Sequence, residues 1–387
     1  MSLLPNKRFS TGSLLQKGRI RVFFVLTFII FLTFLSSCSH KHIPLTITRV
    51  STDKVSFDPA KQEKVDISYS ISKAAQVWVN IYDARNRLVK CVLCNVRQTG
   101  GAHSVSWDGR NAQGIVVPDE AYVYTIAAKK GKDYVVWDLA DLTGGQTVRP
   151  VFFKTDKKKG EIEYGLNKPA RVRINAGLLI KNGAGILMRN LVDWVAQPAG
   201  SYMVRFDGWD ARHQLHFIKD KNFAAGFEGY YLPDNTIIVT GTNSLSAQAY
   251  FRSTWENEQP LRPAIKVTRT RQMHASMDRL YDFSPKMYLQ FPSHVVNSRG
   301  IPMINQHTPI KIGISSQDAP YIKGRIETHI FIDNKLVYQD FSGYMPFTYE
   351  IPSWVKPGKH TIIVFLCIWK DNYATIAQNV YVKRGTL

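Results

Sequence analysis

Val65-Asp-Ile-Ser-Tyr-Ser-Ile71 is the stretch that decides the fold, because its apolar and polar residues alternate strictly. Its four odd-numbered side chains then point to one face and the other three to the opposite face, as in a half-buried β-strand. Val77, Val79 and Ile81 repeat the pattern after a short turn. Similar segments follow, with turn residues about every ten positions. The sequence therefore predicts an all-β chain of β-sandwich domains.

The same stretch recurs later in the chain. Residues 66–80 align with 161–175, and Ile, Tyr, Lys, Ala, Val and Asn stand at equivalent positions, 95 residues apart. Residues 98–112 align with 197–211 at an offset of 99. This internal repeat predicts two tandem sandwiches. A weaker match, of 132–136 with 234–238, places the end of the second sandwich after residue 238.

The turns of the first copy resemble a known family. Gly101-Ala-His-Ser-Val-Ser-Trp-Asp-Gly109, Tyr82-Asp-Ala-Arg-Asn-Arg-Leu-Val89 and Val117-Pro-Asp-Glu-Ala-Tyr122 are similar to the recurrent turns of the immunoglobulin-like (Ig-like) domain of flagellar hook-capping proteins. The second copy keeps Phe206-Asp-Gly208 but lacks the middle turn. The resemblance implies an Ig-like sandwich, and a fold of this kind does not by itself give a function.

A third region also alternates. Ile332-Asp-Asn-Lys-Leu-Val337 and Pro357-Gly-Lys-His-Thr-Ile362 resemble turns of another bacterial Ig-like domain. Asn334 stands where that family often has Gly, and Asn tolerates the left-handed conformation of such a turn. Residues 361–369 are apolar on both faces, which predicts a central strand.

The N-terminus carries an export signal. Leu35-Ser-Ser-Cys38 ends a 14-residue apolar run, preceded by five basic and no acidic residues. The run is shorter than the roughly 20 residues of a membrane span, and the pattern is typical of a secretory signal. The four residues resemble the lipobox of bacterial lipoproteins, which implies that Cys38 is lipidated, for example with palmitate. Ser39 then implies the outer membrane, with the periplasmic or surface face left open. An ordinary cleaved signal and an uncleaved anchor are the alternatives.

Together these features give the predicted organisation: signal peptide 1–37, tether 38–60, first Ig-like domain 61–142, second Ig-like domain 150–243, basic connector 244–286 and third Ig-like domain 287–385.

The net charge is +20, of which five charges lie in the signal peptide, leaving +15. Such a surplus predicts an anionic partner, and for an exported chain this means envelope lipid, an anionic glycan or an acidic protein rather than nucleic acid. A basic surface that serves only solubility is the alternative. We expect partner contacts in two basic segments, at Phe217, Lys219 and Lys221, and at Arg262, Lys266, Arg269 and Arg271. The alternative for the first segment is that its aromatic residues belong to a hydrophobic core, and the alternative for the second is a solvated linker.

Motifs for chemistry are weak. Cys91-Val-Leu-Cys94 lacks the His of a haem-attachment motif, and a bridge would need a turn, because residues i and i+3 of a strand face opposite ways. A structural disulfide or a pair of buried thiols is expected. The Asp108-Gly109 and Asp207-Gly208 turns lack the ligand spacing of a calcium loop. His213 and His216 are three apart, a weak zinc signal. We predict no metal and no cofactor.

The sequence thus favours a membrane-anchored, non-enzymatic scaffold or protein-interaction module of the cell envelope. A surface adhesin or glycan-binding protein is the alternative. An envelope hydrolase with catalytic residues in loops is a further one, and the oligomeric state is left open.

Overall fold

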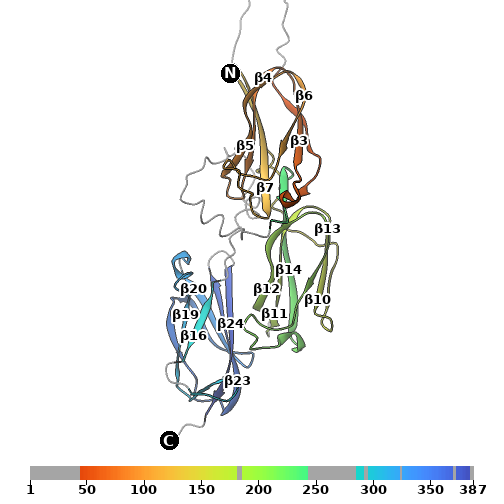
Figure 1. Cartoon of the computed structure of the whole chain (residues 1–387). Helices are drawn as coiled ribbons and strands as arrows, with labels where there is room; N and C mark the ends of the chain where they lie inside the picture. The colour runs from red at the N-terminus through yellow and green to blue at the C-terminus, as the bar shows by residue number, and fades with distance from the viewer. Residues whose placement is uncertain are drawn as a thin grey trace, which may run out of the picture. The chain divides into compact units, whose positions relative to one another are not determined.

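The computed structural model describes residues 44–180, 185–242, 285–291, 295–322, 325–368 and 372–383 (Figure 1). Their elements are β-strands apart from three short 3-10 turns, Pro59–Lys61, Phe217–Lys219 and Ala319–Tyr321. The strands form sheets that share hydrophobic cores, the arrangement of Ig-like β-sandwiches. The predicted all-β fold class is confirmed.

The first sandwich is built around β3 (Val65–Ile71), which lies between β1 (Ile47–Thr52) and β6 (Gly101–Trp107). Alternate residues of β3 are buried, as the sequence pattern predicts, and Trp107 is fully buried in the same core. The second sheet has the order β2-β15-β7-β4-β5, with β8 paired to β7. Its strands are β2 (Ser56–Phe57), β15 (Thr236–Val239), β7 (Glu120–Lys130), β4 (Ala75–Tyr82), β5 (Leu88–Gln98) and β8 (Asp133–Trp137).

Residues 47–57 belong to this sandwich, although they fall within the predicted tether, 38–60. β1 pairs antiparallel with β3, and Phe57 of β2 packs edge-on against Trp107, with ring centroids 5.6 Å apart. Pro59 begins a 3-10 turn whose N-cap, Asp58, accepts a hydrogen bond from the Ala60 N–H. Proline is well suited to that position, because its missing N–H would have no partner there. Pro59 therefore begins a turn of the sandwich and does not mark a linker.

The second sandwich repeats the plan. One sheet has the order β13-β10-β9 and the other β12-β11-β14. Tyr164 of β10 donates a hydrogen bond to Gln197 as Tyr69 of β3 donates one to Gln98, at 2.9 and 2.8 Å. The predicted equivalence of the two copies therefore extends to buried side chains. The strands are β9 (Phe153–Asp156), β10 (Glu161–Leu166), β11 (Ala170–Leu179), β12 (Gly185–Gln197), β13 (Gly200–Arg205) and β14 (Phe223–Tyr231).

Strand β15 corrects the predicted domain boundary. The weaker repeat match predicted Thr236–Val239 in the second sandwich, but β15 pairs antiparallel with β7 and parallel with β2 in the first. Asn235 precedes it, and its side-chain amide donates to the Tyr124 carbonyl and the Asp138 carboxylate at 2.8 and 3.1 Å. The second sandwich is therefore an insertion between two parts of the first.

Strands from the C-terminal part of the chain form two further sheets around one core. β23 lies between β24 and β20, so the predicted central strand is confirmed. Asp333 and Asn334 have φ angles of 51° and 64°, as a type I′ hairpin turn requires. The strands are β16 (Met287–Gln290), β19 (Pro309–Ile314) and β22 (Phe347–Glu350) in one sheet, and β17 (Val295–Val296), β18 (Pro302–Ile304), β24 (Asn372–Val382), β23 (Gly358–Ile368), β20 (Ile326–Ile332) and β21 (Lys335–Gly343) in the other.

Candidate functional site

The predicted contact segment of the second sandwich separates into a buried ring and exposed lysines. Phe217 is 0% exposed and packs against Phe206 and Phe223, with ring centroids 5.3 and 5.9 Å away. The prediction that Phe217 contacts a partner is wrong, because this apolar ring fills the end of the sandwich core. Lys219 and Lys221 are exposed. Their contact with a partner stays a prediction.

A second group of lysines lies in the β9–β10 hairpin, whose turn reads Asp156-Lys-Lys-Lys-Gly160. The Asp156 carboxylate accepts hydrogen bonds from the backbone N–H groups of Lys158 and Lys159, at 2.9 and 3.1 Å. The Lys159 N–H, together with that of Lys158, lowers the pKa of Asp156. Gly160 has a φ of +68°, and a Cβ there would collide with the Phe206 carbonyl oxygen. Glycine is therefore required for the turn that positions the three lysines.

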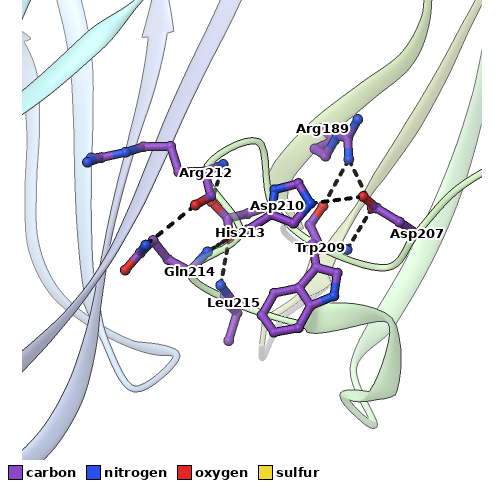
Figure 2. Close-up of polar contacts among 8 residues, drawn as sticks. All are labelled: Arg189, Asp207, Trp209, Asp210, Arg212, His213, Gln214 and Leu215. Carbon is purple, nitrogen blue, oxygen red and sulfur yellow. Dashed lines mark hydrogen bonds and ion pairs between the residues drawn. The ribbon is translucent and has the colours of Figure 1, made fainter. Parts of the chain in front are cut away.

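The Asp207-Gly208 turn lies against this hairpin, because the Phe206 N–H donates to the Gly160 carbonyl at 2.8 Å. Figure 2 shows that the Asp207 carboxylate accepts from Arg189 Nη1 at 3.1 Å and from the Trp209 N–H at 3.0 Å. His213 Nε2 lies 3.3 Å from the same carboxylate. In the first copy, Asp108 pairs with Lys90 at 3.0 Å in the equivalent position. Both copies thus share a turn whose Asp pairs with a cation on an earlier strand of the chain, β5 or β12.

Asp210 organises the loop that follows (Figure 2). Its buried carboxylate accepts hydrogen bonds from the backbone N–H groups of Arg212, Gln214 and Leu215, at 3.0, 2.6 and 2.6 Å. These side-chain-to-backbone hydrogen bonds fix the conformation of a wide loop. His216 packs on the Trp209 ring, with centroids 4.7 Å apart. The hydrogen bonds to Asp210 and the packing of His216 on Trp209 therefore explain the conformation of this loop.

The two lysine groups line one pocket of about 690 Å³ at this end of the second sandwich. Lys157 lies over the Phe223 ring at 5.0 Å, and Lys159 lies 3.9 Å from the Asp156 carboxylate. In the described part of the chain, no carboxylate lies within ion-pair distance of Lys158, Lys219 or Lys221. The pocket is lined by Lys157, Lys158, Lys159, Gly160, Phe206, Asp207, His216, Ile218, Lys219, Asp220 and Lys221.

Of the five lysines that line this pocket, two were predicted from the sequence. Lys219 and Lys221 were found beside aromatic residues, whereas Lys157, Lys158 and Lys159 lie about 60 positions earlier in the chain. The available signal was a run of three lysines between an Asp and a Gly, which marks a turn with a basic tip. That the two groups meet follows from sheet pairing, which is not local in sequence.

The two cysteines of the first sandwich, Cys91 and Cys94, form a disulfide with Cα atoms 5.7 Å apart. The turn that such a bridge needs comes from register shifts between β4 and β5, around Val79, and from Asn95 with a φ of 53°. Equivalent register shifts recur in β12, with Trp194 at a φ of 49°. Both copies therefore have an irregular, bulged strand at this position. The disulfide is found in the first copy.

Several predicted features lie outside the described residues. These are Cys38 and the signal peptide, and the connector residues Arg262, Lys266, Arg269 and Arg271. Within the described ranges, no helix has the length and hydrophobicity to span a membrane. The same ranges contain no group of three or more His, Cys, Asp or Glu residues that could hold a metal ion.

The first sandwich matches a known protein family. Residues 52–132 are similar to the FlgD Ig-like domain. The match covers most of the first sandwich, from the last residue of β1 to the turn between β7 and β8. It supports the Ig-like assignment that the turn motifs predicted, and it covers well under half of the chain. Curated proteins give no match.

Several solved structures are distantly similar to the chain. A tetra-tandem repeat from the extending region of a large adhesion protein is 12% identical with a TM-score of 0.19, covering 88% of this chain and 74% of its own. A Ca²⁺-stabilized ice-binding adhesin of an Antarctic bacterium is 9% identical with a TM-score of 0.18, covering 88% and 74%. Dimeric latent PorU from Porphyromonas gingivalis is 8% identical with a TM-score of 0.18, covering 88% and 34%. TM-scores this low carry no argument about fold or function.

Proposed function

We propose that this chain is an envelope lipoprotein, anchored in the outer membrane through Cys38, that acts as a non-enzymatic scaffold for a protein partner. The lipobox-like sequence Leu35-Ser-Ser-Cys38 supports the anchor, and the Ig-like match supports an interaction module. The basic surface of the mature chain suits an acidic partner.

The observation that carries the scaffold role is the insertion of the second sandwich into the first. Strand β15 returns to the first sheet, so the chain crosses between the two sandwiches twice. A small hydrophobic cluster joins them, and Glu120 of β7 pairs with Arg171 of β11, where both side chains are buried. Two crossings and a buried ion pair suit a part that must hold a binding surface in place. The cluster contains Ala121, Ala196, Leu232 and Ile238.

Two experiments test this proposal. Crosslinking in the intact envelope, followed by mass spectrometry of the attached proteins, is expected to recover a defined partner. Cys38→Ala is expected to move the protein from the membrane to the soluble fraction. A variant that still fractionates with the membrane contradicts the lipid anchor, and a crosslink pattern no different from that of an unrelated basic envelope protein contradicts the scaffold role.

A glycan-binding adhesin is the second candidate, and exposed aromatic residues favour it. Phe341, Tyr344 and Trp354 are 67%, 72% and 53% exposed, and Lys335 lies over the Trp354 ring at 4.7 Å. Exposed aromatic rings are suited to stacking on sugars. Retention of the protein on a polysaccharide column, and its loss when the three aromatics are replaced by Ala, would support this candidate over the scaffold.

A further inference from the structure

We infer that the lysine pocket of the second sandwich binds a phosphorylated sugar or polyol. This inference rests on the interaction module proposed above and adds a small-molecule ligand to its protein partner. It begins from the five lysines that line a single pocket, three of them without a carboxylate partner in the described ranges. Gathered like charges repel one another, so a bound anion stabilises the folded arrangement.

The residue type favours phosphate over carboxylate. Planar carboxylates are recognised best by the two-pronged guanidinium of Arg, and no Arg lines this pocket. The Lys ammonium is a compact point charge with rotatable donors, which suits the three oxygens of a phosphate. A phosphate monoester carries about −1.5 to −2 at neutral pH, so it can engage several lysines together.

The size of the pocket and its other lining residues indicate that the phosphate is attached to a sugar or polyol. A volume of about 690 Å³ far exceeds one phosphate and falls within the range of roughly 300–1,000 Å³ typical of small-molecule sites. Asp207 and Asp220 lie in the same lining. The Asp220 carboxylate accepts hydrogen bonds from the Asn222 N–H and the Asn334 side-chain amide, at 2.8 and 3.1 Å, and its further lone pairs can accept from a hydroxyl group. A carboxylate would repel a bare anion, but it can accept a hydrogen bond from a sugar hydroxyl beside the phosphate.

Calorimetric titration of the full chain in neutral detergent micelles tests the inference, with glucose 6-phosphate as the probe and glucose as its uncharged control. Each charge contributes about fivefold in affinity at contact distance in water, so replacing Lys158, Lys219 and Lys221 together by Ala is expected to weaken binding about 100-fold. The matched control replaces the exposed lysines of the β7–β8 hairpin, which lie outside the pocket, by Ala and removes the same charge. Screening limits its effect to about twofold. The control lysines are Lys129, Lys130 and Lys132.

Equal losses in the two triple variants would overturn the inference, because the effect would then come from net charge. So would binding of a polyglutamate peptide without binding of glucose 6-phosphate. Adding phosphatidylglycerol to the micelles distinguishes the source of the phosphate: competition assigns a lipid headgroup, and no competition assigns a soluble or glycan-borne ligand, with the inference supported in both cases. Failure here leaves the envelope crosslinks unchanged, so it is distinguishable from failure of the scaffold proposal.

Discussion

Glu120→Gln at the junction of the first two sandwiches is expected to be strongly destabilising. Arg171 is 0% exposed, and among the described residues the polar partners of its guanidinium are the Glu120 carboxylate and the Trp194 carbonyl, the latter at 2.9 Å. Glutamine has nearly the same shape as glutamate but no charge. The substitution therefore leaves a guanidinium charge buried without its counter-charge.

The magnitude follows from this burial. Breaking a buried pair by removing one partner costs about 3–5 kcal/mol, a large share of the about 5–15 kcal/mol by which native proteins are stable. For a cooperative unit of about 150–250 residues, each kcal/mol lowers the Tm by roughly 2–4 °C, so a decrease of about 6–20 °C is expected. Replacing both residues by Met is expected to restore most of the loss, because apolar residues of similar volume substitute well for a buried pair.

Thermal unfolding followed by tryptophan fluorescence measures the effect, since Trp107 and Trp194 are buried in the two sandwiches. Asp108→Asn is the matched control, because its pair with Lys90 is about one-third exposed and such pairs contribute only about 0–1 kcal/mol. If Glu120→Gln costs no more than this control, water reaches the Arg171 guanidinium and the account of a dry junction is wrong.

Three further predictions concern single residues. Ile237→Ala is expected to lower the free energy of unfolding by about 2–5 kcal/mol. The first sandwich should then unfold before the second, because this buried residue belongs to the first core. Hydrogen exchange that shows selective unfolding of the second sandwich would contradict the assignment of β15. Gly160→Ala is expected to lower the urea midpoint far more than Gly131→Ala, which also has a positive φ but open space around its Cβ; similar midpoints would show that the β9–β10 turn tolerates a side chain. Burial raises the pKa of Tyr124 to about 12, so this residue stabilises the fold fully below about pH 10 and less as the pH rises to 12; Tyr124→Phe should flatten that alkaline loss in pH-dependent unfolding, and an unchanged profile would refute it.

Local alternation predicted the inner strands well, because a side-chain period of two needs no knowledge of partners. β3 and β4 were visible in this way, and the repeat carried the prediction to β10 and β11. Strand β15 was misplaced, since four consecutive buried residues fit any central strand and its partner β7 lies more than 100 residues earlier. Pairing over that distance leaves no mark in a single sequence.

The candidate site shows the same division. The Asp-Gly turns and the exposed Lys219 and Lys221 were recognisable from the chain, and Phe217 was misjudged because an aromatic beside lysines is equally common in a core. Lys158 lines the pocket because the hydrogen bond between the Phe206 N–H and the Gly160 carbonyl brings two turns together. Such a contact between distant turns is a product of the folded structure.

The return of β15 to the first sheet has a consequence for the order of folding. Strands β9 to β14 pair among themselves, so the second sandwich is complete once residue 231 is available. The first sandwich lacks a strand between β2 and β7 until residue 239 has followed. In a chain that is synthesised from its N-terminus, the later module is therefore expected to fold first. Until then, the earlier one has an open edge at β7, which is exposed to wrong pairing and to capture by chaperones.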